Sequence, residues 1–404
     1  MNVMFLALSR IDSINTPGIY TDLLREFVKH GHTVYIVSAV EADSGPKYIR
    51  KDESSVAYLL VRTGRIQKTS VIKKGINTVL LGRRFMKSIR CSFPNVRIDL
   101  LIYSTPPISL VGVVDNIKRN NQCKTYLLLK DIFPQNAVDL GMLRTNGVRG
   151  LIYKYFRRQE KKLYKVSDLI GCMSKANTEY IIAHNPDIDP SSVEECPNSI
   201  EVRNMSVDKE ARDRIRAKYN LPLDKKVFVY GGNLGKPQGI SFMIECLKKS
   251  ENLNDAYFLI IGDGTEAALI KKYIDDYHPR NVCLLKQLPK ETYDAMVGAC
   301  DIGMIFLDHR FTIPNFPSRL LAYMQAELPV FAITDTNSDI GKVITEGGFG
   351  WWSESNDVDS FINVMNNILS CDLSLYGNRG FVYLERHYDV KTSAELILKH
   401  IENT

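Results

Sequence analysis

The sequence predicts an α/β protein built from two doubly wound domains. Short apolar β-type runs alternate with helix-like segments along all 404 residues, and strands separated by helices form right-handed βαβ units with parallel sheets. A chain of this length is too long for one ordinary core, so two domains of roughly 200 residues are expected. The alternation also restarts near Lys225, after a polar stretch at 198–224 that we interpret as a linker and an entry helix.

The expected strands and helices follow from hydrophobic periodicity. The strands expected in the first half are Asn2–Leu8, Thr33–Ser38, Tyr58–Arg62, Leu100–Tyr103, Thr125–Leu129 and Leu169–Cys172. Those expected in the second half are Val227–Tyr230, Tyr257–Ile261, Val282–Leu285, Ile302–Phe306 and Val330–Ile333. Helical periodicity lies between most of them, for example at Thr21–Lys29 and Ala267–Tyr277.

These elements predict three segments. An N-terminal domain is expected at 1–200, a C-terminal domain at 201–385, and a last helix at 386–404 that packs back on the first domain. In doubly wound domains ligands bind at the carboxyl ends of the strands, so we expect the two domains to face a central cleft.

Composition excludes several classes of protein. Apolar residues make up 45% and charged residues 24% of the chain, as in soluble globular proteins. The 8 cysteines are scattered without a CxxC pair, which argues against a zinc site or a disulfide framework and fits a reducing cytoplasm. The start, MNVMFLALSR, has no basic region and is expected to be a strand rather than a signal peptide. No apolar run reaches about 18 residues, so no membrane-spanning helix is expected.

The net charge of +6 conceals an asymmetry between the two halves. Residues 1–200 carry 29 Lys and Arg against 18 Asp and Glu, whereas the remainder carries 23 against 28. The first half is therefore basic and the second mildly acidic, which indicates different partners for each.

The stretch FVYGGNLGKPQG, Phe228–Gly239, predicts a phosphate-binding loop. A strand-like run ends in Gly231 and Gly232, passes a turn and enters an apolar-periodic segment at Ile240. Glycines at a strand-to-helix turn allow close approach of a ligand, and the helix N-terminus offers free N–H groups to an anion. Lys236 is placed to neutralise a phosphate. The alternative is a tight turn without a ligand, with Lys236 merely solvated.

Two further segments strengthen this prediction. In IIGDGTE, Gly262 and Gly264 flank Asp263 where a strand ends and a helix starts. In PNFPSRLLAYMQAELPVFA, Pro317 and Ser318 predict a helix start that Ser318 caps, with Arg319 in the first turn. The guanidinium of Arg319 and the free N–H groups of that turn would hold a diphosphate. The alternative is an ordinary capped helix before the next strand.

The best catalytic carboxylate of the first half is Asp131. It follows the apolar strand Thr125–Leu129, and a carboxylate at that edge of the sheet faces the expected cleft. A carboxylate that only caps a turn is the alternative. Gly18 lies at a helix start after the first strand, and Asp12 lies in the loop before it. Gly18 would face the same cleft, and Asp12 is a weaker candidate for the acceptor side.

Two basic segments of the first half, Lys68–Arg90 and Arg144–Lys165, interleave their charges with bulky apolar residues. Such segments are typical of interfacial helices on anionic lipid, where each basic residue near the surface contributes about 1 kcal/mol. The alternative for each is a core-packed helix with a solvated basic face.

Together these motifs resemble the retaining glycosyltransferases of family 4, which have the GT-B fold of two Rossmann-like domains. The resemblance runs through GIYTDLLREFVKHGHTVYIVS, KDIFPQNAVDLGML, IGCMSKANTEYI, YGGNLGKPQG, IIGDGTE and PSRLLAYMQAELPV. Within that family the chain is most similar to bacterial polysaccharide enzymes of the L-fucosamine-transferase-like branch. The resemblance implies a nucleotide-sugar donor in the C-terminal domain and an undecaprenyl-diphosphate-linked saccharide as acceptor on the side of the N-terminal domain.

The chain departs from the family pattern at several positions. The family's pair of glutamates falls on Pro314 and Ala322, and its diphosphate-binding Arg and Lys fall on Asn233 and Gln238. Where relatives have Gly, this chain has Glu327. Asn233 and Gln238 are kept as donor-binding candidates, but the charge of the phosphates would then be met by Lys236, Arg319 and backbone N–H groups.

These observations predict a cytoplasmic, membrane-associated transferase that moves a sugar, most simply from UDP, to a lipid-linked saccharide. Lys236, Ser318 and Arg319 would stabilise charge on the leaving diphosphate, and Asp131 would orient or deprotonate the acceptor hydroxyl. The base would lie against the turn 262–264 and the loop 286–288, with Gln287 as a contact. No metal or other cofactor is expected where cationic side chains hold the diphosphate.

Three rivals remain open at this stage. The missing carboxylates are compatible with a non-catalytic binding or scaffold protein, and another two-domain enzyme of UDP-sugars, such as a non-hydrolysing 2-epimerase, would share the same loops. Nucleic-acid binding by the basic half is disfavoured because its charges alternate with bulky aliphatics and no nucleic-acid motif is present.

Overall fold

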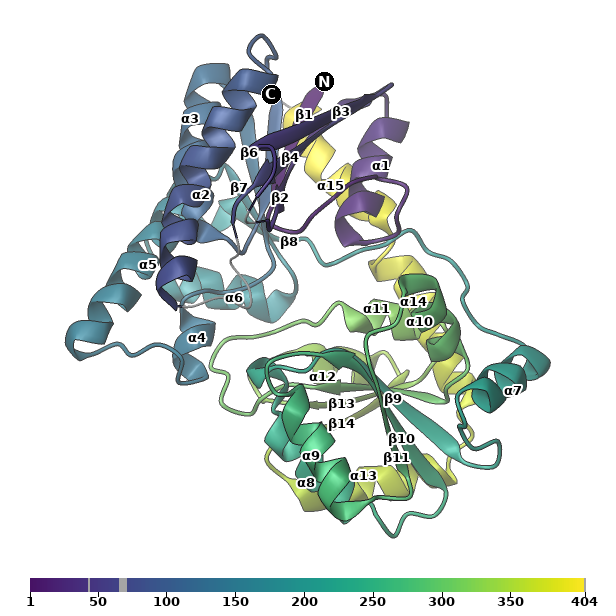
Figure 1. Ribbon diagram of the computed structural model, residues 1–404. Helices are drawn as coiled ribbons and strands as arrows, with labels where there is room; N and C mark the ends of the chain where they lie inside the picture. The colour runs from purple at the N-terminus through teal and green to yellow at the C-terminus, as the bar shows by residue number, and fades with distance from the viewer. Residues whose placement is uncertain (43, 65–70, 403–404) are drawn as a thin grey trace. The chain divides into compact units, whose positions relative to one another are not determined.

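A computed structural model describes residues 1–42, 44–64 and 71–402 of the protein (Figure 1). The chain forms two compact units. Unit 1 comprises Met1–Glu201 together with Val390–Thr404, and unit 2 comprises Val202–Asp389. Each unit is a Rossmann-like α/β domain around its own sheet, so the predicted fold class is confirmed.

Unit 1 contains an 8-stranded sheet in the order β3-β4-β2-β1-β5-β6-β7-β8. Neighbouring strands pair in parallel except β3 and β4, which are antiparallel. The strands are β1 (Asn2–Ala7), β2 (Thr33–Val40), β3 (Tyr48–Glu53), β4 (Val56–Arg62), β5 (Leu100–Ser104), β6 (Lys124–Leu129), β7 (Leu169–Cys172) and β8 (Val193–Glu195).

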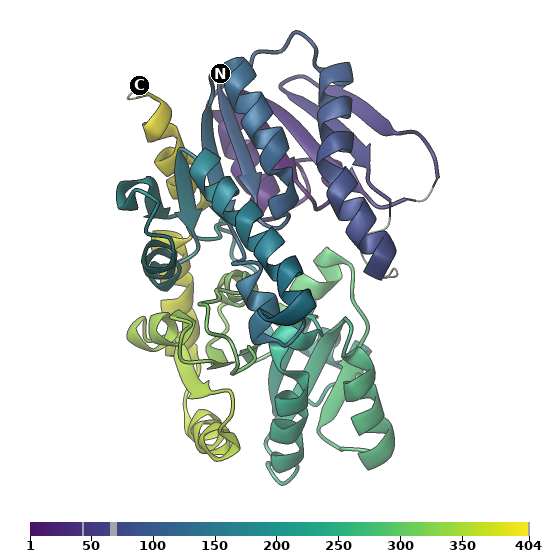
Figure 2. The same cartoon turned by 90° about the vertical axis from the view of Figure 1, so that its left-hand side faces the viewer.

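The helices of unit 1 cover both faces of this sheet. They are α1 (Ile19–Lys29), α2 (Val71–Ser92), α3 (Val111–Asn121), α4 (Gln135–Asp139), α5 (Gly147–Val166), α6 (Lys175–His184) and α15 (Val390–Glu402), with short turns at Ile108–Leu110 and Pro190–Ser192. Helices α2, α3 and α5 form one layer, in which α3 contacts both of the others (Figure 2). Helices α1 and α15 contact each other and pack on the opposite face.

The last helix, α15, completes the core of unit 1 although it follows unit 2 in sequence. Its Ala394 and Ile397 share one hydrophobic cluster with Leu23 and Phe27 of α1. At its start the backbone N–H of Val390 donates to the carbonyl oxygen of Ile200 at 3.0 Å.

Unit 2 contains a 6-stranded, wholly parallel sheet in the order β11-β10-β9-β12-β13-β14. Its strands are β9 (Lys226–Asn233), β10 (Ala256–Asp263), β11 (Val282–Leu285), β12 (Ile302–Phe306), β13 (Val330–Thr334) and β14 (Gly350–Glu354). Its helices are α7 (Lys209–Lys218), α8 (Ile240–Lys249), α9 (Ala267–Tyr277), α10 (Lys290–Gly298), α11 (Arg319–Gln325), α12 (Ile340–Glu346), α13 (Val358–Ser370) and α14 (Ser374–His387), with a turn at Lys236–Gln238.

All eleven expected strands are present, and the described residues contain three further strands that were not predicted. β3 is an exposed edge strand with four charged residues in six, β8 has only 3 residues, and β14 contains two tryptophans after a glycine. None of these three has the apolar run from which strands were predicted.

Two local predictions were wrong. The strand expected at Val227–Tyr230 is longer, because β9 continues through Gly231 and Gly232 to Asn233 while it pairs with β10. Ser318 does precede α11, but its backbone is helical (φ −64°, ψ −13°) and its side chain makes no capping hydrogen bond. A cap needs an extended backbone at that residue, as Asp357 has before α13.

Candidate active site

In unit 2 the strand order reverses between β9 and β12, the place where ligands bind in doubly wound sheets. The carboxyl end of β9 carries Gly231, Gly232 and Asn233. Asp308 follows the carboxyl end of β12. The predicted phosphate loop therefore lies at the switch point of the sheet.

The loop after β9 is tied to the loop after β12 by its backbone. The N–H of Asp308 donates to the carbonyl oxygen of Pro237 at 3.0 Å. Gly239 has φ +59°, and a Cβ there would lie 3.3 Å from the Cα of Asp308. These contacts fix the loop from a neighbouring strand.

Inside the loop, the buried Gln238 organises the turn. Its Oε1 accepts hydrogen bonds from the backbone N–H of Gly235 and from Nδ2 of Asn233, both at 3.2 Å. Lys236 lies on the same turn with an exposed side chain. The structure thus brings Asn233 and Gln238 together, and the amide oxygen of Gln238 is used within the loop itself.

The glycines of the second motif have a packing explanation. A Cβ on Gly262 would lie 1.9 Å from the carbonyl oxygen of Gly232, and one on Gly264 would lie 2.3 Å from that of Leu234. The close approach that we predicted there is an approach of the neighbouring loop. Asp263, between the two glycines, is exposed at the end of β10 and accepts the N–H of Gly264 at 2.8 Å. Their contact with a donor stays a prediction.

Arg319, the first residue of α11, reaches the carboxyl end of β9. Its guanidinium carbon lies 4.3 Å from the ring centroid of Tyr230, a cation–π geometry. A Cβ built on Gly232, which has φ +132°, would lie 3.4 Å from that same carbon. Only a glycine both adopts this backbone conformation readily and leaves the guanidinium face open here.

One nitrogen of Arg319 has no partner. Its Nη1 is buried, and among the described residues no atom accepts a hydrogen bond from it. A buried donor without a partner costs about 1–3 kcal/mol, more when it is charged, so buried polar groups are nearly always paired. A charged donor left open beside an exposed glycine is typical of a site that receives an anionic ligand.

Three tyrosines hold this arrangement together. Tyr230 Oη donates to the carbonyl oxygen of Asn233 at 2.8 Å. Tyr323 Oη accepts the N–H of Gly231 at 3.2 Å and donates to the carbonyl oxygen of Met304 at 3.0 Å. A Cβ on Gly231 would lie 2.0 Å from Tyr293 Oη, which shows that the phenol of Tyr293 covers β9 at this glycine. Burial raises the pKa of Tyr293 to about 12, which keeps it neutral.

Sequence reasoning missed these tyrosines. Tyr230 is the last residue of the expected strand before Gly231, and that position was the available signal for it. Tyr293 comes from α10, and nothing in its local sequence links it to the loop.

The remaining donor-side candidates are more peripheral. Ser318 is exposed and Pro317 is half-buried, both before a helix of only 7 residues. Gln287 is exposed in the loop between β11 and α10. Because α11 is so short and Ser318 does not cap it, the positive charge beside Gly232 comes from the guanidinium of Arg319 rather than from the helix terminus.

Besides Asp263, two carboxylates that were not predicted, Asp308 and Asp335, lie at this edge of the sheet. Asp308 pairs with Arg310 at 2.7 Å. Asp335 is buried directly after β13 and accepts hydrogen bonds from Ser338 Oγ at 2.9 Å and Ser338 N at 2.8 Å. Burial raises the pKa of Asp335 to about 6. Both carboxylates brace loops in the structure.

In unit 1, Asp131 lies two residues after the end of β6, at the carboxyl edge of the sheet. Nδ2 of Asn136 donates to both carboxylate oxygens at 2.7 Å, which fixes the orientation of the group. Burial raises the pKa of Asp131 to about 6 despite these bonds. Such a carboxylate is suited to proton transfer near neutral pH.

The two other candidates of unit 1, Gly18 and the weaker candidate Asp12, lie before α1. Asp12 is exposed and pairs with Arg10 at 2.7 Å. The N–H of Gly18 donates to Asp22 Oδ1 at 3.0 Å, a bond within the start of the helix. Their role on the acceptor side stays a prediction.

Within residues 1–42, 44–64 and 71–402, no helix combines the length and the apolar character needed to cross a bilayer. Within the same ranges no group of three or more His, Cys, Asp or Glu side chains is arranged to hold a metal ion.

Comparison with solved structures gives the class of the fold. Anabaena Alr3699/HepE in complex with UDP superposes with a TM-score of 0.69 over 100% of both chains, at 13% sequence identity. At this identity the likeness shows the fold alone. The fold is that of the two-domain GT-B glycosyltransferases.

Sequence comparison adds the relatives. Residues 211–379, which lie within unit 2, match the model of the family Glycosyl transferases group 1. The probable glycosyltransferase WbjE of Pseudomonas aeruginosa is 24% identical over 336 residues, which cover 82% of this chain and 80% of that protein. The putative colanic acid biosynthesis glycosyl transferase WcaI of Escherichia coli K12 is 31% identical over 93 residues, or 22% of this chain and 21% of that protein.

Proposed function

We propose that the protein is a glycosyltransferase that moves a sugar from a UDP-sugar to a lipid-linked saccharide in bacterial polysaccharide synthesis. The observation that carries the proposal is the open, buried Nη1 of Arg319 beside Gly232, at the switch point of the sheet. The choice of UDP is supported by HepE, which was solved with UDP. The saccharide context is supported by WcaI, described as an enzyme of colanic acid biosynthesis.

In the proposed mechanism Arg319 binds the diphosphate and stabilises the charge that develops on it as the glycosidic bond breaks. The ring of Tyr230 and the backbone of Gly232 hold the guanidinium in place before the donor arrives. Lys236 and Ser318, both exposed, add a cation and a hydroxyl from the loop and the helix start. The donor sugar is an N-acetylated amino or deoxy sugar, and transfer retains its configuration without a metal.

On the acceptor side, Asp131 receives the proton of the attacking hydroxyl. Its position at the carboxyl edge of β6 and its fixed orientation support this role. We further propose that the enzyme works at the inner face of the cell membrane, where a lipid-linked acceptor is held, through basic residues of α2 and α5. Lys68 lies outside the described residues, as do the side chains of 71–79 and of Arg149.

Calorimetry with UDP tests the donor site. Arg319→Ala removes a charge-assisted contact worth about 1.5–3 kcal/mol, so UDP affinity is expected to fall about ten- to hundredfold. Arg319→Lys should retain part of the affinity, because the charge stays but the bidentate geometry is lost. Arg280→Ala is the matched control, since Arg280 is exposed before β11 at the opposite edge of the sheet. Unchanged affinity in a folded Arg319→Ala variant would remove the proposed role of this residue.

Product analysis tests the reaction. Mass spectrometry of mixtures of UDP-sugars with undecaprenyl-diphosphate-linked acceptors should show one added sugar, and NMR of the product should show the donor's anomeric configuration. Binding of UDP without turnover of any donor would instead favour the scaffold alternative. The absence of carboxylates at Pro314 and Ala322 is compatible with that alternative.

A further inference from the structure

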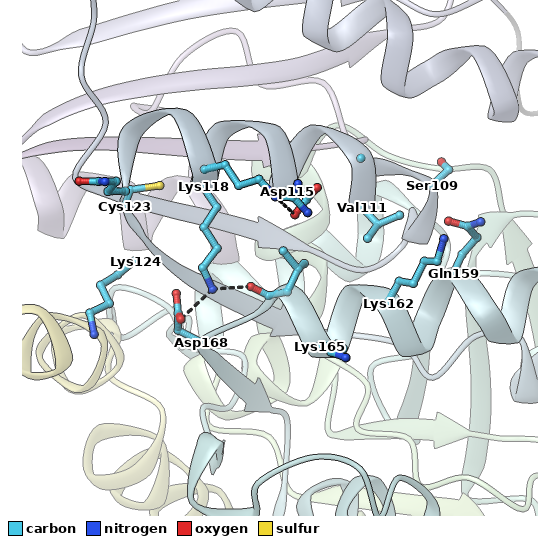
Figure 3. Close-up of a pocket in the computed structure, with 14 residues that line it drawn as sticks. Ser109, Val111, Asp115, Lys118, Cys123, Lys124, Gln159, Lys162, Lys165 and Asp168 are labelled. Carbon is cyan, nitrogen blue, oxygen red and sulfur yellow. Dashed lines mark hydrogen bonds and ion pairs between the residues drawn. The ribbon is translucent and has the colours of Figure 1, made fainter.

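A basic groove of about 1050 Å³ runs between α3 and α5 of unit 1 (Figure 3). It extends to Lys124, the first residue of β6, and to Asp168, which directly precedes β7. It therefore reaches the amino ends of these strands, whereas Asp131 lies at the carboxyl end of β6. The groove is thus separate from the acceptor-side residues described above.

The charges that line this groove do not balance. Its acidic residues are both paired, because Lys118 contacts Asp168 at 2.7 Å and Arg119 contacts Asp115 at 2.9 Å. The lining residues left without an acidic partner, among the residues that the structure describes, are Lys124, Lys162 and Lys165. Three ammonium groups therefore line one open groove with no protein anion to neutralise them.

A second groove of about 620 Å³, between α2 and α3, adjoins the first, because Gly112 lines both. Its cations are Arg83, Lys87 and Arg90, spaced so that they lie on one face of α2. Within the described part of the chain none of the three has an acidic partner. Arg90 donates to Asn116 Oδ1 at 3.2 Å. Together the two grooves form one cationic surface, which we name the α2–α3–α5 face and define by these six unpaired cations.

The α2–α3–α5 face continues into exposed apolar side chains. Ile152 and Tyr155 of α5 are 50% and 47% exposed. Their spacing to Gln159 and Lys162 places all four on the stripe of α5 that lines the groove. Leu151 is 64% exposed beside them. The stripe is therefore apolar toward the N-terminus of α5 and cationic toward its C-terminus.

We propose that the α2–α3–α5 face docks on an anionic bilayer, with lipid phosphates in the two grooves and the N-terminal end of α5 in the interfacial layer. Phosphate diesters supply the anions that the six cations lack, and the acyl boundary covers the apolar side chains. A soluble anion would satisfy only the first of these features. This inference rests on the proposed function, in which a lipid-linked acceptor requires the enzyme at a membrane.

Co-sedimentation of the full chain with vesicles tests the cationic part. Wild-type protein should bind equimolar phosphatidylglycerol and phosphatidylcholine, should not bind phosphatidylcholine alone, and should lose affinity as salt shortens the Debye length. Because each basic residue near an anionic surface strengthens binding about fivefold, Lys162→Gln with Lys165→Gln should weaken it about 25-fold. The matched control is Lys271→Gln with Lys272→Gln on α9, which removes the same net charge from unit 2.

A second variant tests the apolar part. Ile152→Ser with Tyr155→Ser should reduce the fraction of binding that persists at high salt, because that fraction depends on buried apolar area rather than on charge. Both side chains are half-exposed, so the folded state should be retained, and circular dichroism checks this.

Several results would overturn the proposal. The proposal would be overturned if the Lys162→Gln, Lys165→Gln variant bound vesicles as tightly as wild type. It would also be overturned if the Lys271→Gln, Lys272→Gln control lost as much affinity, because binding would then depend on net charge alone. Displacement of the protein from vesicles by glycerol phosphate at constant ionic strength would indicate a site for soluble phosphate esters. UDP calorimetry on the same variants keeps this test separate from the proposed function. Because Arg319 lies in unit 2, the affinity of these unit 1 variants for UDP should equal that of wild type.

Discussion

At the scale of single residues, the candidate site of unit 2 centres on one cation and the rings around it. Arg319 is charged, its Nη1 is buried, and it lies against Tyr230 and Gly232. Asn233 and Gln238 are uncharged and are bonded to each other. The positive charge against the carboxyl end of β9 therefore comes from Arg319, which follows β12 in the sequence.

The raised pKa of Asp131 predicts how kcat/KM depends on pH. Its pKa is raised to about 6, and only the ionised form accepts a proton, so kcat/KM should fall as the pH drops through about 6. Asp335 also has a pKa raised to about 6, so the fall of kcat/KM in wild type does not by itself identify the carboxylate responsible. The Asp131→Asn variant should lose most activity, and its residual kcat/KM should no longer fall near pH 6. The control Asp187→Asn, at an exposed site, should keep both the activity and the fall near pH 6.

The same carboxylate makes a prediction about stability. Because burial raises its pKa, folded Asp131 is more protonated than unfolded Asp131 between its ordinary pKa and about 6. Stability from this group is therefore lost as pH rises through that window. Thermal melts should show Asp131→Asn gaining stability relative to wild type at neutral pH and little at acidic pH. A variant that melts lower at neutral pH would contradict this account.

At the scale of elements, α11 ends in a left-handed turn at Glu327. The N–H of Leu328 donates to the carbonyl oxygen of Tyr323 at 2.9 Å, and that of Glu327 to Met324 at 3.1 Å, which closes the helix in a left-handed turn. Glu327 has φ +53°, a conformation that favours glycine. A glycine would adopt this conformation without strain.

Glu327→Gly should therefore stabilise the protein. Release of the left-handed strain contributes about 1 kcal/mol, partly offset by loss of the exposed hydrogen bond from Asn204 Nδ2 to Glu327 Oε1. Urea denaturation should show a higher midpoint for Glu327→Gly and no gain for Glu327→Gln, which keeps the strain. Equal stability of the two variants would show that the left-handed residue costs little here.

At the scale of the whole molecule, the chain ends in the unit in which it began. Helix α15 packs on α1, and its Ile397 and Ala394 lie in the core cluster of unit 1. Residues between Val202 and Asp389 form a separate core. The folding of unit 1 consequently requires residues that are synthesised after the whole of unit 2.

This connectivity predicts which unit a core mutation affects. Ile397→Ala should cost about 2–5 kcal/mol, because it opens a cavity in a fully buried cluster. Hydrogen exchange should accelerate in peptides of β1 and α1 but not in those of β9 and β10. The exposed Glu395→Ala on the same helix is the control, expected to lie within about 0.5 kcal/mol of wild type. Faster exchange in β9 and β10 alone would contradict the assignment of α15 to unit 1.

The sequence by itself determined the alternation of strands and helices, because hydrophobic periodicity is a local property. The eleven predicted strands carry apolar runs, whereas the exposed β3, the three-residue β8 and the tryptophan-containing β14 do not and were missed. It also located the glycine loop and Asp131, since both follow predicted strands and the carboxyl edge of a parallel sheet is where ligands bind.

Tertiary structure decided the rest. The cation–π contact of Arg319 with Tyr230, the cover of Tyr293 over Gly231 and the pairing of Gln238 with Asn233 join groups whose proximity depends on how helices pack against strand ends. The α2–α3–α5 face likewise depends on helix packing, because the sequence showed basic segments but not which cations remain unpaired. Periodicity specifies which face of an element is buried, but only packing specifies which side chains from distant elements share one site.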